Sequence, residues 1–280
     1  NSWLEWCAGK GYLGRVLANQ SQLPVISLEF QALLCGAGQQ FADRHHLPMT
    51  FIPIDVFSAQ VDHYLHSDQH AIALHACGDL HRQLIVSAVD KRLKAITFSP
   101  CCYHLISGND YQPLSIDVQQ SRLSLTKNDL RIPLQETVTG GERVRRHRQQ
   151  EMIYRLGFDA LLRDGGVVSE YCPVPSIKKS QLADGFQSFC QWAACQIQKP
   201  LPACDYSYFE QVGTNRFWQM ERISLVQQSF KRLLEYWIVL DKVLFLESSG
   251  YQVSMRQFCS RDDTPRNIMV HAVIAESECR

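Results

Sequence analysis

The chain has 280 residues, enough to bury a large core without disulfide bonds, and its 28 basic and 28 acidic residues leave no net charge. This balance argues against a strongly basic nucleic-acid module and against a polybasic membrane protein, although a local basic patch is compatible with it. The sequence has neither an apolar run of about 18 residues nor a signal peptide, so we expect a cytoplasmic protein without membrane contact. Its 11 scattered cysteines then predict mostly reduced thiols.

Short apolar stretches alternate with helical stretches between residues 2 and 99. The predicted strands are Ser2–Trp6, Val25–Phe30, Thr50–Ile54, Ala71–His75 and Ala95–Ser99, and the predicted helices are Tyr12–Gln20, Gln31–His46 and Leu80–Lys91. This alternation indicates βαβ units, hence a parallel sheet with helices on both faces.

The strand pattern stops after residue 104. Helices are predicted over Glu142–Arg163, Gln181–Ile197 and Phe217–Leu246, and the last carries an apolar stripe formed by Val226, Phe230, Leu233, Trp237, Leu240 and Leu244. Alternating residues from Tyr251 to Arg256 and a return strand over Asn267–Ala275 predict a C-terminal antiparallel hairpin. We therefore expect an α/β fold in which residues 1–104 and 216–280 form the sheet domain. Residues 105–215 form a mostly helical insertion that caps the carboxyl ends of the strands.

A glycine-rich loop follows the first strand and opens the first helix. Gly9, Gly11 and Gly14 fit the spacing G-x-G-x-x-G, which permits a tight turn, close approach of a ligand and an anionic group at the helix N-terminus. Glu29 ends the second strand, at the separation expected for an acid that binds a ribose diol. A purely structural turn and an exposed strand-end carboxylate are the alternatives. The pattern predicts a nucleoside cofactor.

Asp55, followed by Val56, comes after the third strand. Its carboxylate either accepts a hydrogen bond from an adenine amino group or caps a helix. A nicotinamide dinucleotide, used by an oxidoreductase, and S-adenosylmethionine both fit these features. The C-terminal hairpin favours S-adenosylmethionine, because that strand arrangement is typical of methyltransferases.

Two loops rich in cysteine and histidine follow the fourth and fifth strands. Residues 74–80 read Leu-His-Ala-Cys-Gly-Asp-Leu, and residues 99–104 read Ser-Pro-Cys-Cys-Tyr-His. His104 or Tyr103 would serve as a base or orienting group for a methyl acceptor, or Cys101 or Cys102 as a nucleophile, as in cytosine-C5 methylation. The cysteines and histidines would otherwise bind zinc, or the cysteines simply pack at the strand end. Because paired C-x-x-C spacing is absent, no metal is predicted.

Three motifs occur in a characteristic order: Cys-Ala-Gly-Lys-Gly-Tyr-Leu-Gly, Leu-His-Ala-Cys-Gly-Asp-Leu and Pro-Cys-Cys-Tyr-His. Residues 1–104 thereby resemble the methyltransferase domain of the family that includes methyltransferase-like protein 25 and its bacterial relatives. A more distant similarity is to transfer-RNA ribose 2′-O-methyltransferases. The resemblance implies a Rossmann-like class I methyltransferase fold that binds S-adenosylmethionine. One departure is that Cys7-Ala8 stands where many methyltransferases have the first glycine of the loop.

By matched position, the resemblance implies that Gly9, Gly11, Glu29 and Asp55 contact the cofactor and that Cys77 and Asp79 lie nearby. The complete set that we expect around the cofactor is Glu5, Ala8, Gly9, Gly11, Gly14, Glu29, Asp55, Val56, His75, Cys77 and Gly78.

The densest basic run supplies Arg143, Arg145, Arg146 and Arg148 to one predicted helix, where they would bind RNA phosphates or form a solvated face. No aromatic residues are interleaved with these arginines, so the run alone does not support readout of single strands. We predict an S-adenosylmethionine-dependent methyltransferase that acts on RNA or on a translation-associated protein, such as a ribosomal protein. The alternative is a catalytically silent module that binds RNA or protein on the same fold.

Overall fold

The computed structural model describes residues 2–74, 76–134 and 141–275. The chain divides into two compact units. We call Asn1–Leu134 with Lys231–Arg280 the sheet unit, and Gln135–Phe230 the helical unit. The boundaries expected at residues 104 and 215, and the capping role of the insertion, stay predictions.

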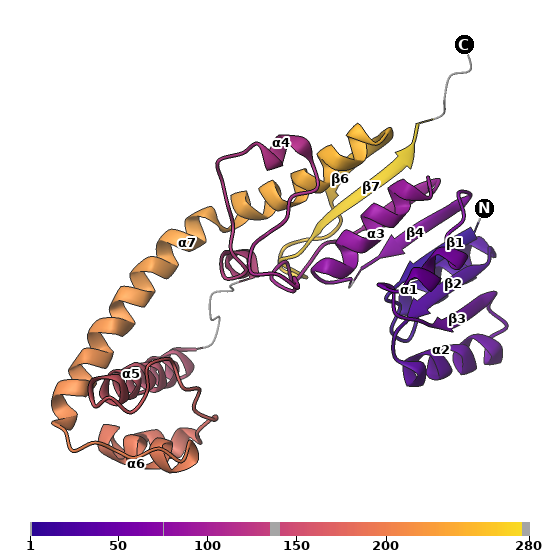
Figure 1. The fold of residues 1–280 in the computed structure, drawn as a ribbon. Helices are drawn as coiled ribbons and strands as arrows, with labels where there is room; N and C mark the ends of the chain where they lie inside the picture. Colours follow the sequence, from indigo (N-terminus) through magenta and orange to yellow (C-terminus); the bar gives the residue numbers. More distant parts are fainter. Residues whose placement is uncertain (1, 75, 135–140, 276–280) are drawn as a thin grey trace. The chain divides into compact units, whose positions relative to one another are not determined.

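The sheet unit contains seven strands in the order β3-β2-β1-β4-β5-β7-β6 (Figure 1). The parallel strands are β1 (Ser2–Trp6), β2 (Val25–Glu29), β3 (Met49–Pro53), β4 (Gln69–Ala73) and β5 (Ala95–Phe98). The antiparallel strands are β6 (Tyr251–Gln257) and β7 (Ile268–Ile274), and β7 lies between β5 and β6. This arrangement confirms the predicted Rossmann-like α/β fold with its C-terminal hairpin.

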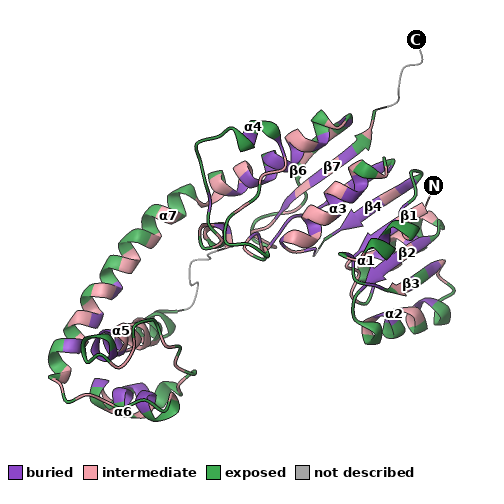
Figure 2. Cartoon of the chain, in the orientation of Figure 1, coloured by how far each residue is buried: buried purple, intermediate pink, exposed green. Residues whose placement is uncertain are grey.

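Helices α1 (Tyr12–Ser21), α2 (Ala32–Arg44) and α3 (Asp79–Asp90) connect the parallel strands, and a short α4 (Ile116–Gln119) follows β5. Two 3-10 turns, Ala59–Tyr64 and Asp129–Leu134, complete the described part of this unit before α7. Leu4, Leu28, Ala71 and Ile96 each lie fully buried in a different parallel strand. Figure 2 shows buried segments in the strands of the sheet. Apolar positions in adjacent strands are buried together because helices cover both faces of a parallel sheet.

The helical unit is built from α5 (Glu142–Asp164), α6 (Phe186–Gln196) and the first part of α7 (Tyr206–Ser248). Its core is aromatic: Phe158 and Phe189 are each 1% exposed and meet edge to face. Gly213 of α7 lies against α5 so closely that a Cβ there would come within 2.3 Å of the Ile153 carbonyl oxygen. The close approach of these two helices therefore depends on glycine.

Three predicted features of this region are wrong in detail. The helix expected over Gln181–Ile197 is split into a 3-10 turn (Lys179–Asp184) and α6, because Gly185 between them has a φ of +89°. Helix α7 begins at Tyr206 rather than at Phe217. The apolar stripe does not mark the buried face of α7, since Phe230 is 57% and Leu233 65% exposed.

The buried face of the second part of α7 instead mixes apolar and polar residues. Ile238, Val239 and Leu246 are fully buried there, together with Asp241 and Lys242. A pattern of apolar residues cannot locate such a face. The pattern treats every polar residue as exposed, including those that are buried with hydrogen-bond partners.

Gly213→Ala is expected to destabilise the helical unit by about 1–3 kcal/mol, because the added methyl group forces α5 and α7 apart. Denaturant unfolding followed by tryptophan fluorescence measures the change. Gly36→Ala is the control: this α2 glycine has no atom within 4 Å of an added Cβ, so alanine should be neutral or stabilising there. Equal effects of the two substitutions would contradict the packing argument.

Candidate functional site

The glycine loop after β1 is fixed to the end of β2. The Glu29 carboxylate accepts hydrogen bonds from the backbone N–H of Gly9 at 2.9 Å and of Gln31 at 2.9 Å. Gly9 has a φ of +59°, and no atom lies within 4 Å of a Cβ built on it. The loop is thus held by the acid while its surface at Gly9 stays open to a ligand.

Two other loop positions are occupied by the protein itself. Gly11 has a φ of +72°, and a Cβ there would lie 2.4 Å from the Phe51 ring, so this glycine packs the loop against β3. Gly14 donates its N–H to Glu5 at 2.9 Å, and the other Glu5 oxygen accepts from Ser27 at 2.8 Å. Burial raises the pKa of Glu5. The expected cofactor roles of Glu5, Ala8 and Gly14 stay predictions.

Asp55 stands exposed after β3, with buried Val56 beside it. One carboxylate oxygen of Asp55 accepts from the Phe57 N–H at 2.9 Å, which closes a local turn. This contact is not the helix cap that the sequence offered as an alternative, because Ser58 is the N-cap of the 3-10 turn that follows. It leaves the second Asp55 oxygen for a ligand.

The cysteine loops after β4 and β5 meet directly. The sulfur atoms of Cys77, Cys101 and Cys102 all lie within 4.8 Å of one another, and Cys77 Sγ is 3.1 Å from Cys101 Sγ. Gly78 makes this approach possible: it has a φ of +57°, and a Cβ there would lie 1.9 Å from the Leu105 carbonyl oxygen. His75 falls outside the described residues.

The thiols of this cluster influence one another. The hydrogen bond between Cys77 and Cys101 raises the pKa of Cys77 and lowers that of Cys101. Burial raises the pKa of Cys102. Burial and the charges of Glu29, Cys77 and Asp55 raise the pKa of Cys7 to about 12, so Cys7 also lies in the electrostatic range of the cluster. Cys101 is the cysteine of the cluster whose thiolate the surroundings favour.

Tyr103 and His104 lie in different surroundings. The Tyr103 hydroxyl is buried, 3.2 Å from both a Glu235 carboxylate oxygen of α7 and the Pro100 carbonyl, and burial keeps its pKa well above the usual range. His104 Nδ1 is buried without a hydrogen-bond partner among the described residues. Burial, followed by the charges of Arg131 and Lys127, lowers the pKa of His104. Neutral His104 can accept a proton, whereas Tyr103 is engaged with α7; both catalytic roles stay predictions.

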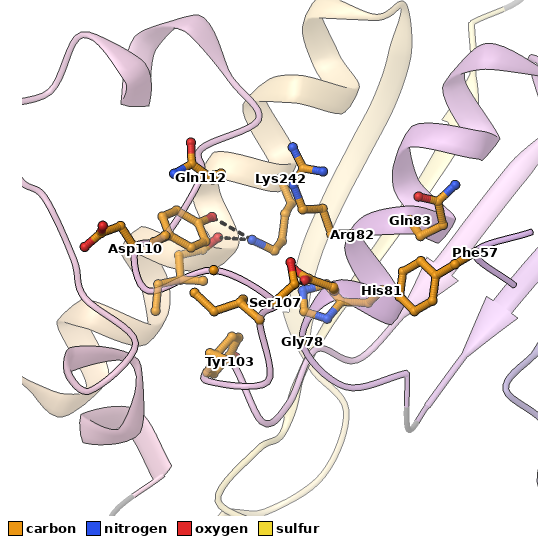
Figure 3. A pocket seen from close by; sticks show the side chains of 15 residues that line it. Phe57, Gly78, His81, Arg82, Gln83, Tyr103, Ser107, Asp110, Gln112 and Lys242 are labelled. Atoms are coloured by element: carbon orange, nitrogen blue, oxygen red, sulfur yellow. Dashed lines mark hydrogen bonds between the residues drawn. The ribbon is translucent and has the colours of Figure 1, made fainter.

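A cavity of about 290 Å³ opens between the N-terminal end of α3, the loop after β5 and α7 (Figure 3). Lys242 projects to its wall and donates to the Tyr111 hydroxyl at 2.8 Å, and Tyr111 in turn donates to Asp241 at 2.5 Å. Burial lowers the pKa of Lys242 to about 8. The sequence analysis did not single out Asp241 and Lys242, although a charged pair inside an apolar stretch of a helix is itself a signal of a buried polar site.

A larger groove of about 990 Å³ lies in the helical unit, between α5 and α7. Arg145 and Arg148 line it from α5, and Arg216 and half-exposed Trp218 line it from α7. Arg143 and Arg146 are exposed on α5 but do not line the groove. The fold thus places an aromatic residue beside the arginines, although the basic run itself contains none.

Residues 1–109 match the model of a family described as "Methyltransferase domain". Among curated proteins none is significantly similar to the chain. The chain is similar to a transfer-RNA (uracil-54, C5)-methyltransferase of Pyrococcus abyssi solved with S-adenosyl-L-homocysteine. The identity is 16%, the match covers 36% of this chain and 24% of that one, and the TM-score is 0.29. The chain is also similar to an rRNA methylase of Streptococcus thermophilus. The identity is 18%, the match covers 35% of this chain and 61% of that one, and the TM-score is 0.29.

The match therefore spans less than two thirds of either neighbour, and similarity at this level does not extend to activity or substrate. The strand order is that of a Rossmann-like fold, and residues 1–109 of this chain match a methyltransferase domain family. No helix among the described residues has the length and apolar character needed to cross a bilayer.

The stability of the sheet unit should depend on pH through His81, which lines the smaller cavity and is 3% exposed. Its Nδ1–H donates to the Ala76 carbonyl at 3.1 Å, and burial lowers its pKa to about 3. Between pH 6.5 and about pH 3, the unfolded chain binds a proton at His81 that the folded chain does not bind. The free energy of unfolding therefore falls as the pH falls.

From pH 6.5 to pH 5, the wild-type protein should lose about 2 kcal/mol more unfolding free energy than His81→Phe. Urea unfolding at each pH measures this difference. His63→Gln, at an exposed position, should keep the wild-type pH dependence. Equal pH dependence in the wild-type and His81→Phe proteins would show that His81 does not control acid stability.

Proposed function

We propose that the chain is an S-adenosylmethionine-dependent methyltransferase that modifies RNA and is related to the family of methyltransferase-like protein 25. The observation that carries the proposal is the open glycine loop fixed by Glu29, within the region that matches a methyltransferase domain family. S-adenosylmethionine would supply an activated methyl group on a sulfonium. Catalysis then requires mainly the alignment of acceptor, methyl group and sulfur.

The residues present fit this cofactor. The open backbone at Gly9 admits a close ligand. Glu29 keeps lone pairs for ribose hydroxyls beyond the two amide contacts, because an ionised carboxylate accepts about four hydrogen bonds. The second oxygen of Asp55 would accept from an adenine amino group. The His104 ring would take up the proton that the acceptor loses, because its Nδ1 has no hydrogen-bond partner among the described residues.

The groove of the helical unit supports RNA as the acceptor. Arg145 and Arg148 would supply cations for phosphates, and Trp218, 49% exposed, would offer a ring face for an unpaired base. Arg216 also lines the groove and is paired with Asp159 at 3.1 Å. Arginines and an aromatic ring in one groove support a single-stranded RNA ligand rather than the solvated face that the sequence offered as an alternative.

Gly9→Leu is expected to weaken S-adenosylhomocysteine binding at least about tenfold, because the side chain enters the open space at the loop where the ligand must approach the backbone. Isothermal titration calorimetry measures the affinity. Gly250→Leu is the matched control in the same unit, with a φ of +87° and open space at its Cβ, and should bind normally. If the wild-type protein gives no heat but still binds RNA, the chain is the catalytically silent module instead.

Arg145→Gln combined with Arg148→Gln should weaken binding of a mixed-sequence single-stranded RNA, measured by fluorescence anisotropy across salt concentrations. The salt slope should fall by about 0.7 for each phosphate that the variant no longer neutralises. Trp218→Ala should cost about 1–3 kcal/mol with the slope unchanged.

Arg143→Gln combined with Arg146→Gln removes the same charge from the same helix outside the groove, and should have the smaller effect. Equal reductions of affinity in the two double variants would refute the groove as the RNA site. Methylation of a ribosomal protein by a chain that does not bind RNA would establish a protein acceptor.

A further inference from the structure

The convergence of three sulfur atoms at the ends of β4 and β5 requires unusual backbone. Successive side chains of an extended segment point to opposite sides, so neighbouring Cys101 and Cys102 would ordinarily diverge. Cys102 instead has a φ of +45°, a region that L-residues other than glycine rarely adopt. This conformation, with the close packing at Gly78, accompanies the gathering of both sulfurs beside Cys77. Strained backbone of this kind concentrates at functional sites.

The distances suit a soft metal ion. Two thiolates bound about 2.3 Å from a tetrahedral zinc ion lie about 3.8 Å apart. Cys77 Sγ and Cys101 Sγ are 3.1 Å apart and all three sulfur atoms lie within 4.8 Å of one another, so the required spacing lies between these two values.

A cationic side chain lies near the cluster. Arg266 is within electrostatic range of Cys77, Cys101 and Cys102. The Arg266 Nε is buried and has no hydrogen-bond partner among the described residues. Three thiolates around a divalent ion leave one net negative charge, which this guanidinium would balance.

We propose that Cys77, Cys101 and Cys102 bind one Zn²⁺ ion through three thiolates. Among the described residues, the cluster contains no fourth cysteine, histidine or acidic ligand atom. Three protein ligands together with a water or substrate atom are typical of catalytic rather than structural zinc. The spacing rule that excluded a metal in the sequence applies to knuckles close in the chain, whereas these ligands come from two adjacent strand ends.

Metal analysis of the full chain, purified without a metal-affinity tag or chelator, tests the proposal directly. Mass spectrometry of the metal content should find one zinc per chain. Replacement by Co²⁺ should give intense thiolate-to-cobalt absorption in the near ultraviolet, and this measurement on the wild-type protein needs no substitution.

Cys77→Ser, Cys101→Ser and Cys102→Ser should each weaken zinc affinity, measured by chelator competition, by more than the roughly 10–100-fold lost with an outer-shell partner. Cys259→Ser, in the loop between β6 and β7 of the same unit, should retain the metal. Circular dichroism identifies any variant that fails to fold.

Substoichiometric zinc with all three thiols free to alkylation would overturn the proposal, as would a Cys77–Cys101 disulfide in the freshly purified protein. S-adenosylhomocysteine titration of the same samples separates the two proposals. If the wild-type protein holds zinc but does not bind S-adenosylhomocysteine, the zinc proposal stands and the methyltransferase proposal is refuted.

Discussion

The hydrogen bonds of the Glu29 carboxylate hold together the connections that follow β1 and β2. Its two oxygens accept N–H groups from the loop after β1 and from the residue that begins α2, so one side chain fixes the relative position of two connections. A hydrogen bond to a charged acceptor is stronger than one between neutral groups. The same carboxylate, only 8% exposed, keeps lone pairs beyond these two contacts. Glu29 thereby both stabilises the scaffold and is a candidate to bind the cofactor.

Polar contacts from α7 fix the loop that follows β5. Asp241 is fully buried and accepts hydrogen bonds from the backbone N–H groups of Leu114 and Ser115 as well as from Tyr111. Nearer the start of the helix, Arg232 bonds to Glu235 and to Asn267 of the hairpin. Removal of one partner from such a charged network leaves an uncompensated group, which is more costly than loss of an exposed pair. Tyr103 of the cysteine loop donates to the same Glu235, so α7 holds this loop as well.

The sequence predicted the strands of the sheet to within about two residues, because parallel strands are continuously apolar and are bounded by turn residues. It also placed Cys77 and Cys101 after consecutive strands, and adjacent parallel strands end at one edge of a sheet. The cavity containing Lys242 and the groove lined by Trp218 and Arg148 could not be predicted, because each is formed by segments far apart in the chain. The buried face of α7 was missed for a different reason. Asp241 is polar, and it is buried only because hydrogen-bond partners surround it.

The position of β7 between β5 and β6 has a consequence for synthesis. Thr97 on β5 shares a hydrogen bond with His271 on β7, 174 positions later, and every residue of the helical unit is translated between them. On the ribosome, β5 therefore emerges long before its antiparallel neighbour, and one edge of the nascent sheet stays unpaired until the hairpin arrives. Exposed strand edges invite pairing with other chains. During this interval the nascent chain should depend on chaperones, and early termination before the hairpin should leave an aggregation-prone product.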